Sequence, residues 1–241
     1  MNQDDLTVGV LGGMGPEATI DFMSLVVALS GATNDQDHIH LIVDQNPKVP
    51  NRQQALRGEG PNPGAVLATM ARRLEQAGAD FLVMPCNTAH AFTAAIREAV
   101  KIPLISIIDV TVDEIGVACP LALEVGIMAT DGMLQAGLLQ NALAESGRKA
   151  VLPTGDELGQ LMDLIHGIKA GDKSSASRHA MAALAKALEL RGAEVVIAAC
   201  TEIPLLLRQS DLTVPLISTT EVLARRTVSL ARRALPLYAT N

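Results

Sequence analysis

The chain has 241 residues, which is enough for one large α/β domain or two of about 110 to 120 residues. Hydrophobic residues make up 49% and aromatics only 2%, so the core has to be built from Val, Ile, Leu, Ala and Met, a palette that suits parallel strands buried on both faces. The net charge of −7, without a concentrated basic stripe, argues against nucleic acid as a partner.

Apolar, strand-like runs alternate with helical patterns along the chain. The predicted strands are, in chain order, Thr7–Leu11, Ile39–Asp44, Phe81–Met84, Leu104–Ile107, Val125–Ala129, Ala150–Leu152, Val195–Ala199 and Leu216–Ser218. The predicted helices between them are Glu17–Leu29, Gly64–Gln76, Leu134–Glu145, Glu157–Ala170 and Ser175–Leu190. This βαβα order predicts a parallel, doubly wound α/β fold.

The chain also repeats itself. The stretch RRLEQAGADFLVMPCNTAH (72–90) aligns with KALELRGAEVVIAACTEIP (186–204), so that Cys86 falls on Cys200 at an offset of 114 residues (200 minus 86). Self-similarity over such a distance is the signature of a duplicated structural unit.

Two further blocks follow the same order. IPLIS (102–106) matches VPLIS (214–218) at an offset of 112, and VGVLGGMG (8–15) resembles VGIMATDG (125–132) at 117. Three matched blocks in one order predict two similar lobes related by a pseudo-twofold axis, each a parallel sheet flanked by helices, with the active site in the cleft between them. We expect one lobe to comprise residues 1–110 and a C-terminal helix at 220–241, and the other to comprise residues 111–219.

Each repeat places a cysteine where a buried strand ends and a helix is expected to begin. Ligands of parallel sheets bind at the carboxyl ends of the strands, and a helix start favours ionisation of a thiol. Cys86 and Cys200 would then lie on either side of a small molecule. One thiolate could remove a proton from a carbon centre while the opposite thiol returns one, which inverts that centre without a cofactor. Cys119 has no repeat partner and is interpreted as a structural or surface thiol.

The motifs GVLGGMGPEAT, NPKVPNR, MPCNTAHAF, HGIKAG and AACTEIPLLL closely resemble the aspartate/glutamate racemase superfamily, and its aspartate racemases most of all. The resemblance covers nearly the whole chain. It implies a racemase that interconverts L- and D-aspartate, with glutamate as a further candidate substrate, and that needs no pyridoxal phosphate or other cofactor. It also implies a homodimer, with Cys86 and Cys200 as the catalytic pair.

The same resemblance implies the residues that bind substrate. Arg52 and Lys169 match positions that hold substrate carboxylates, and Thr130 matches the opening loop of the second lobe. The residues beside the two cysteines would contact the amino-acid end of the substrate; they are Asn87, Thr88, Thr201 and Glu202.

The loop GMGPEA (13–18) fits the dinucleotide pattern G-x-G-x-x-A. The acidic residue that should follow about 20 residues later is absent, because Asp44 lies 29 residues beyond Gly15. We therefore interpret this loop as an amino-acid-binding loop that includes Met14.

Two departures favour aspartate, or a dual specificity, over a glutamate-specific enzyme. LGGMGP stands where glutamate racemases carry an Asp-Ser-Gly turn, and Glu202 stands where they carry a histidine.

Other classes of function remain open from the sequence. The same cleft would serve a two-lobed binding protein without catalysis, and the two thiols could form a reversible disulfide if their Cα atoms came within about 7 Å. No metal is expected, because the His pair in DHIH (37–40) lacks a third ligand. The polar start, the odd number of cysteines and the lack of an apolar run of about 18 residues predict a cytoplasmic protein with no membrane partner.

Overall fold

The computed structural model describes residues 5–237. The chain divides into two compact units, here called unit 1 (Met1–Val110 with Thr220–Asn241) and unit 2 (Thr111–Thr219). Each unit has its own four-stranded parallel sheet. The division therefore follows the sheets, and the last helix belongs with the first sheet although it is last in the chain.

Unit 1 has the strand order β2-β1-β3-β4. Every residue of the two central strands, β1 and β3, is buried, which explains why they read as uninterrupted apolar runs. The strands are β1 (Val8–Gly12), β2 (Leu41–Gln45), β3 (Phe81–Val83) and β4 (Leu104–Ile105).

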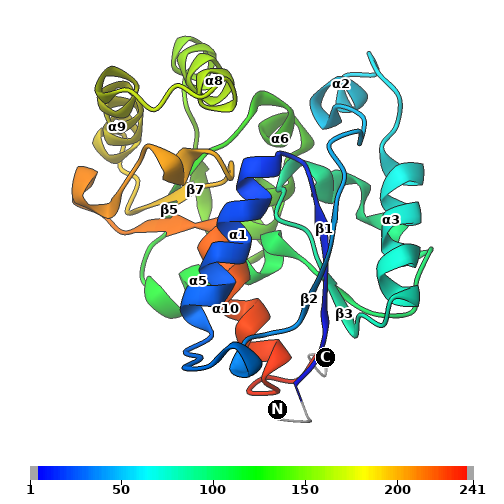
Figure 1. Cartoon of the computed structure of the whole chain (residues 1–241). Coiled ribbons are helices and arrows are strands. Elements are labelled where there is room, and N and C mark those ends of the chain that lie inside the picture. The colour runs from blue at the N-terminus through cyan, green and yellow to red at the C-terminus, as the bar shows by residue number, and fades with distance from the viewer. Residues whose placement is uncertain (1–4, 238–241) are drawn as a thin grey trace. The chain divides into compact units, whose positions relative to one another are not determined.

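Helices cover both faces of this sheet, with α3 on one side and α1 and α10 on the other (Figure 1). The end of α10 is tied to the entry of β1, because Leu6 N donates to Ala231 O at 2.8 Å. The helices of this unit are α1 (Pro16–Leu29), η1 (Asp35–Asp37), α2 (Arg52–Leu56), α3 (Gly64–Gln76), η2 (Thr88–Phe92), α4 (Thr93–Arg97) and α10 (Thr219–Ala231), where η marks a 3-10 helix.

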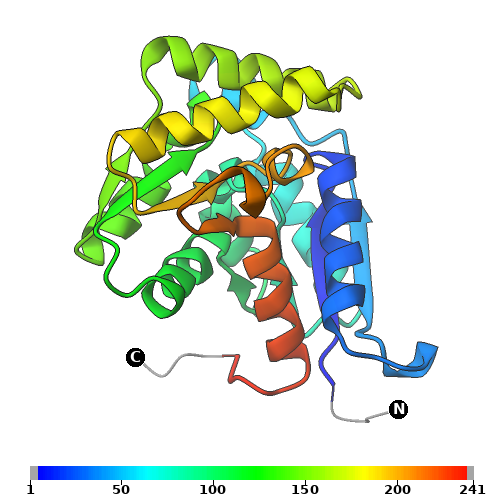
Figure 2. The ribbon, with the colours of Figure 1, turned by 90° about the vertical axis from the view of Figure 1, so that its left-hand side faces the viewer.

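Unit 2 repeats this plan with the order β6-β5-β7-β8, in strands β5 (Glu124–Met128), β6 (Lys149–Val151), β7 (Val195–Ala198) and β8 (Leu216–Ser218). Its long helices α8 and α9 lie side by side, and α9 packs on β5 and β7 (Figure 2). The helices are α6 (Asp131–Ala136), α7 (Leu138–Glu145), α8 (Gly155–Lys169), η3 (Ile203–Leu205), η4 (Gln209–Asp211) and α9 (Ser175–Leu190), while α5 (Ile107–Ala118) spans the point where the units divide.

The predicted fold class, two parallel α/β lobes, is confirmed. The predicted C-terminal helix at 220–241 is too long, because α10 ends at Ala231, and positions 238–241 lie outside the described residues. A second predicted helix, Leu134–Glu145, is wrong as a single element. The chain forms α6 and α7 instead, because Gly137 between them has φ = +67°. That left-handed conformation ends α6, and only glycine adopts it without strain.

Carboxylates close the amino edge of the sheet in unit 1. Glu75 Oε1 accepts from the N–H groups of Lys101 and Ile102 at 2.7 and 3.2 Å, just before β4. Asp80 Oδ2 accepts from Thr7 N at 2.7 Å, just before β1. These N–H groups precede the strands and have no ladder partner there, so the side chains satisfy them.

The repeat places the same device in unit 2. Glu189 Oε1 accepts from Thr213 N and Val214 N at 2.7 and 2.8 Å, and Glu194 Oε2 accepts from Leu123 N and Glu124 N at 2.6 and 3.0 Å. Burial raises the pKa of Glu189, but these bonds outweigh it and leave that pKa below its usual value. The backbone bonds to Glu194 lower its pKa as well.

A glycine in each central strand lies where the neighbouring side chains leave little or no room for a Cβ atom. A Cβ added at Gly9 would lie 2.7 Å from Leu82 Cδ2 and 2.9 Å from Ala79 Cβ. The repeat-related Gly126 is less crowded, with its nearest such contacts at 3.1 Å to Ala193 Cβ and 3.2 Å to Val196 Cγ2. The two lobes therefore share this packing arrangement, but the side chains lie closer to Gly9 than to Gly126.

We predict that Gly9→Ala lowers the free energy of unfolding by about 1 to 3 kcal/mol, because the new methyl group overpacks against Leu82 of β3 and Ala79. The matched change Gly126→Ala should cost about 1 kcal/mol less, since its neighbours need to move by only a few tenths of an ångström. Urea unfolding curves of both variants test this, and a larger loss for Gly126→Ala would contradict it.

Of the helices in residues 5–237, none combines the length and the apolar character that a membrane crossing requires.

Candidate active site

Cys86 lies directly beyond the carboxyl end of the buried strand β3. Met84 is fully buried, and Cys86 N donates to Met84 O at 2.8 Å, which turns the chain out of the sheet. The Cys86 residue is 6% exposed and packs in one apolar cluster with Met14 and Val49. Asn87, which follows, is buried, and the chain continues into η2.

His90 fixes the carbonyl of this cysteine. Its Nε2 accepts from Ile107 N at 3.1 Å, so the ring proton is on Nδ1, which donates to Cys86 O at 2.9 Å. Burial lowers the pKa of His90 from 6.5 to about 4, against the hydrogen bond to Cys86, which raises it. His90 is therefore a neutral link between the cysteine turn and the start of α5.

Arg52 occupies the first position of α2, and α2 packs against η2. Its NH1 group donates to the carbonyls of Val49 and Pro50 at 3.3 and 3.2 Å. Its Nε is buried and has no hydrogen-bond partner among the described residues. An arginine with an unpaired buried donor suits an anion, because such a donor is costly to leave unsatisfied.

In unit 2, Cys200 follows β7 in the same way, and Ala199 N still pairs with Met128 O at 2.8 Å. Cys200, Thr201 and Glu202 are 7%, 3% and 4% exposed. Glu202 Oε2 accepts from Cys200 Sγ at 2.9 Å and from Thr201 Oγ1 at 3.2 Å.

Lys169, at the end of α8, completes this polar group. Its Nζ lies 3.6 Å from Glu202 Oε1, and its side chain is 41% exposed while that of Glu202 is 5% exposed. Burial raises the pKa of Cys200 well above its ordinary value, the charge of Glu202 raises it further, and Lys169 opposes both. The second cysteine thus has a charged partner.

The structure gathers the predicted site residues in two sets, one at the carboxyl edge of each sheet. In unit 1, Met14 packs in one cluster with Cys86, Asn87 and Thr88 lead from that cysteine into η2, and Arg52 begins the helix α2 that packs against η2. In unit 2, Cys200, Thr201 and Lys169 all contact the carboxylate of Glu202. Thr130 caps α6, and its Oγ1 accepts from Met133 N at 3.3 Å. Their predicted contacts with substrate stay predictions.

One part of the local prediction is wrong. The sequence predicts that each cysteine lies near the start of a helix whose dipole would favour the thiolate, but the elements that follow are the short 3-10 helices η2 and η3. Such short elements carry little dipole. His90 was not predicted as a site residue, although its position four residues after Cys86 could have indicated a contact with that carbonyl.

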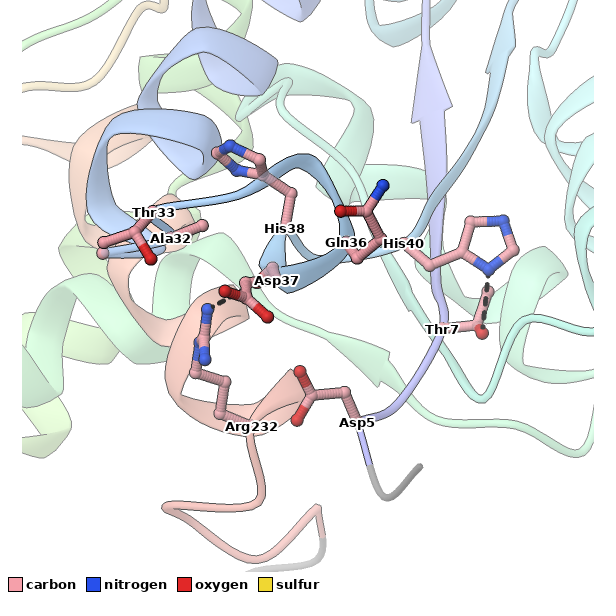
Figure 3. Close-up of a pocket in the computed structure, with 10 residues that line it drawn as sticks. Asp5, Thr7, Ala32, Thr33, Gln36, Asp37, His38, His40 and Arg232 are labelled. Atoms are coloured by element: carbon pink, nitrogen blue, oxygen red, sulfur yellow. Dashed lines mark hydrogen bonds between the residues drawn. The ribbon is translucent and has the colours of Figure 1, made fainter. Parts of the chain in front are cut away.

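A cavity of about 520 Å³ lies elsewhere in unit 1, at the amino ends of β1 and β2 (Figure 3). Arg232 NH2 donates there to Asp37 O at 2.8 Å, and His40 Nδ1 lies 3.4 Å from Thr7 Oγ1. Because the strands are parallel, this cavity and Cys86 lie at opposite edges of the sheet.

A smaller cavity, of about 340 Å³, lies between α9 and the segment of η3 and η4. Within residues 5–237 no three or more His, Cys, Asp and Glu side chains are grouped so that they could hold a metal ion.

The comparison with known proteins gives the family. Residues 11–227 match the family model of Asp/Glu/hydantoin racemases, and the chain therefore belongs to that family. It is 27% identical to the broad-specificity amino-acid racemase RacX of Bacillus subtilis over 227 residues, which are 92% of this chain and 96% of the relative.

Solved structures agree with this assignment. The aspartate racemase of Picrophilus torridus superposes with a TM-score of 0.84 at 25% identity and covers 94% of each chain. An aspartate racemase homologue from Pyrococcus horikoshii gives 0.76 at 25% identity, over 94% of this chain and 99% of that one. Glutamate racemase of Francisella tularensis, at 15% identity and a TM-score of 0.68, covering 99% of this chain and 85% of that one, shares the fold.

We predict that stability falls as the pH drops from about 6.5 to about 4, because the unfolded chain binds a proton at His90 that the folded chain excludes. The loss should reach about 3 kcal/mol, at about 1.4 kcal/mol per pH unit. Carboxylates such as Glu157, whose pKa the hydrogen bond from Arg191 lowers to about 2, contribute only at pH values below about 4.5.

Denaturant unfolding at pH values between 7.5 and 4.5 measures this loss. His90→Gln should reduce the change of the unfolding free energy with pH, whereas the exposed control His166→Gln should leave that change as in the native chain. An unchanged slope in His90→Gln would show that His90 is not the group responsible.

Proposed function

We propose that this chain, as an isomerase of the racemase family, interconverts L- and D-aspartate by a two-base mechanism that uses no pyridoxal phosphate, with glutamate as the second candidate substrate. One observation carries the proposal: Cys86 and Cys200 follow corresponding strands, β3 and β7, in two sheets of the same strand order. Duplicated thiols suit a reaction whose forward and reverse directions are mirror images.

In the proposed reaction, the thiolate of one cysteine takes the α-hydrogen as a proton, and the C–H electron pair stays on carbon as a carbanion conjugated with the carboxylate. The thiol of the other cysteine then gives its proton to the opposite face. The mechanism requires both sulfurs to reach the same carbon. The developing negative charge needs fixed donors, since preorganised polar groups are usually the largest contribution to such catalysis.

Arg52 is the proposed clamp for a substrate carboxylate, because its buried Nε has no partner among the described residues. Lys169 already pairs with the carboxylate of Glu202, and a substrate carboxylate would be a second anion for it. Asn87, Thr88, Thr201 and Glu202 are the proposed contacts for the amino-acid end, with Met14 and Thr130 beside them.

Aspartate is the first candidate substrate because the Picrophilus torridus relative is named an aspartate racemase. The Bacillus subtilis relative is named a broad-specificity racemase, so the assay has to cover all common amino acids. The homodimer and the cytoplasmic location stay predictions. Exposed apolar side chains at the end of α5 and before β5, namely Val117, Leu121 and Leu123, would suit a subunit contact.

We predict that Cys86→Ser and Cys200→Ser each lower kcat for aspartate racemisation by at least about 100-fold, because removing a proton-transfer group costs about that much or more. Chiral chromatography of L- and D-aspartate, with a chelator and a carbonyl reagent present and no added cofactor, measures the loss. Cys119→Ser is the matched control and should keep full activity. Full activity in either of the first two variants would reject the two-base assignment.

We also predict that racemisation in heavy water places deuterium at the α-carbon of the product, because the returning proton comes from a thiol that exchanges with solvent. Mass spectrometry or proton NMR of the product measures this. Inversion that retains the original hydrogen over many turnovers would argue against the mechanism. Binding of amino acids without any inversion would instead identify a two-lobed binding protein, and loss of two thiols on mild oxidation would indicate a redox pair.

A further inference from the structure

The carboxyl edge of the sheet in unit 2 carries a carboxylate that two-base chemistry does not by itself require. Glu202 is nearly inaccessible to solvent, and it has polar partners within its own unit. Its Oε2 accepts from Cys200 Sγ at 2.9 Å and from Thr201 Oγ1 at 3.2 Å, and its Oε1 lies 3.6 Å from Lys169 Nζ. Each of these three partners is a potential hydrogen-bond donor.

These contacts fit one protonation state. A thiol donates a hydrogen bond only while it carries its proton, and a carboxylate flanked by an ammonium group and two donors is best satisfied as an anion. A thiolate at Cys200 would instead place two negative charges about 3 Å apart in a buried site. The arrangement therefore favours protonated Cys200 beside ionised Glu202, with Lys169 as the counter-ion.

The two cysteines differ in this respect. The repeat aligns Glu202 with Thr88, a hydroxyl residue without charge. The residue bound to Cys86 is neutral His90, and it contacts the backbone carbonyl rather than the sulfur. Among the described residues, Cys86 Sγ has no hydrogen-bond partner. The duplication has therefore kept the thiols and changed the charge beside one of them.

We propose that Glu202 is a positioning residue that holds Cys200 as the proton-bearing thiol in the resting protein, with Lys169 as its counter-ion, so that Cys86 is the resting base. This inference deepens the proposed racemase function and rests on it. In turnover, the Cys86 thiolate takes the α-proton and the Cys200 thiol gives its proton to carbon. The Cys200 thiolate then regains a proton from water, and the Cys86 thiol loses one to water.

The ratio of kcat/KM for the two enantiomers cannot reveal which cysteine carries the proton in the resting protein. L and D enantiomers have equal free energies in water, so the equilibrium constant is one and kcat/KM must be the same in both directions for every variant. The resting state therefore has to be read from the thiols themselves, by following thiolate formation with pH through its ultraviolet absorbance.

The experiment uses the full chain with one thiol at a time: Cys86→Ser with Cys119→Ser retains Cys200, and Cys200→Ser with Cys119→Ser retains Cys86. We expect the ionisation of Cys200 to depend on the charge of Glu202, which lies 2.9 Å from its sulfur. Adding Glu202→Gln should lower the Cys200 midpoint by about one pH unit or more, because it removes the neighbouring charge. The same change should leave the Cys86 midpoint unchanged.

Lys169→Met provides a second variant that leaves the buried carboxylate in place, should Glu202→Gln fail to fold. Removing the counter-ion should raise the Cys200 midpoint. Asp163→Asn, an exposed carboxylate on α8, is the matched control for net charge and should leave both midpoints unchanged. An unmoved Cys200 midpoint in Glu202→Gln, or a lowered one in Lys169→Met, would overturn the inference.

The readout needs no substrate, so it separates this inference from the function on which it rests. If the chain racemises aspartate but Glu202→Gln does not change the pH midpoint of Cys200 ionisation, this inference alone is overturned. A chain that racemises no amino acid but titrates as expected would overturn the proposed function and leave the assignment of the Cys200 proton supported.

Discussion

Unpaired backbone N–H groups at the amino edge of a parallel sheet impose the constraint on which both units depend. Each unit meets it with carboxylates: Glu75 and Asp80 in unit 1, and Glu189 and Glu194 in unit 2. These bonds fix where the strands begin, and a glycine in the central strand leaves room for the side chains that pack against it. Because the structural hydrogen bonds lie at the amino edge of each sheet, the loops at the carboxyl edge can hold the cysteines and their polar neighbours.

That opposite edge is where the duplicated halves diverge. After Cys86 the chain provides neutral His90, which binds the cysteine carbonyl, whereas after Cys200 it provides Glu202, which binds the sulfur and Lys169. The same turn out of the sheet therefore gives two thiols in different electrostatic surroundings. The two units share the backbone path around the cysteine, and single side chains two to four residues after each cysteine give the two thiols different charged or neutral neighbours.

The sequence pattern predicted the parallel α/β class and the position of both cysteines, because buried central strands are uninterrupted apolar runs and the repeat aligns their ends. It could not predict the break at Gly137, since apolar periodicity continues through it and only the backbone angle reveals the turn. Nor could it predict that Lys169 pairs with Glu202 or that His90 reaches Ile107, because both contacts join residues far apart in sequence. Long-range side-chain pairing depends on packing, which local patterns do not encode.

The aliphatic core has a practical consequence for optical work on this protein. The sequence contains no tryptophan and only one tyrosine, and Phe22 and Phe81 are among its largest fully buried side chains. The native chain therefore has no indole fluorescence. A tryptophan introduced into either unit would be the sole indole emitter and would report that unit alone, so the order in which the two sheets lose their packing could be followed one sheet at a time.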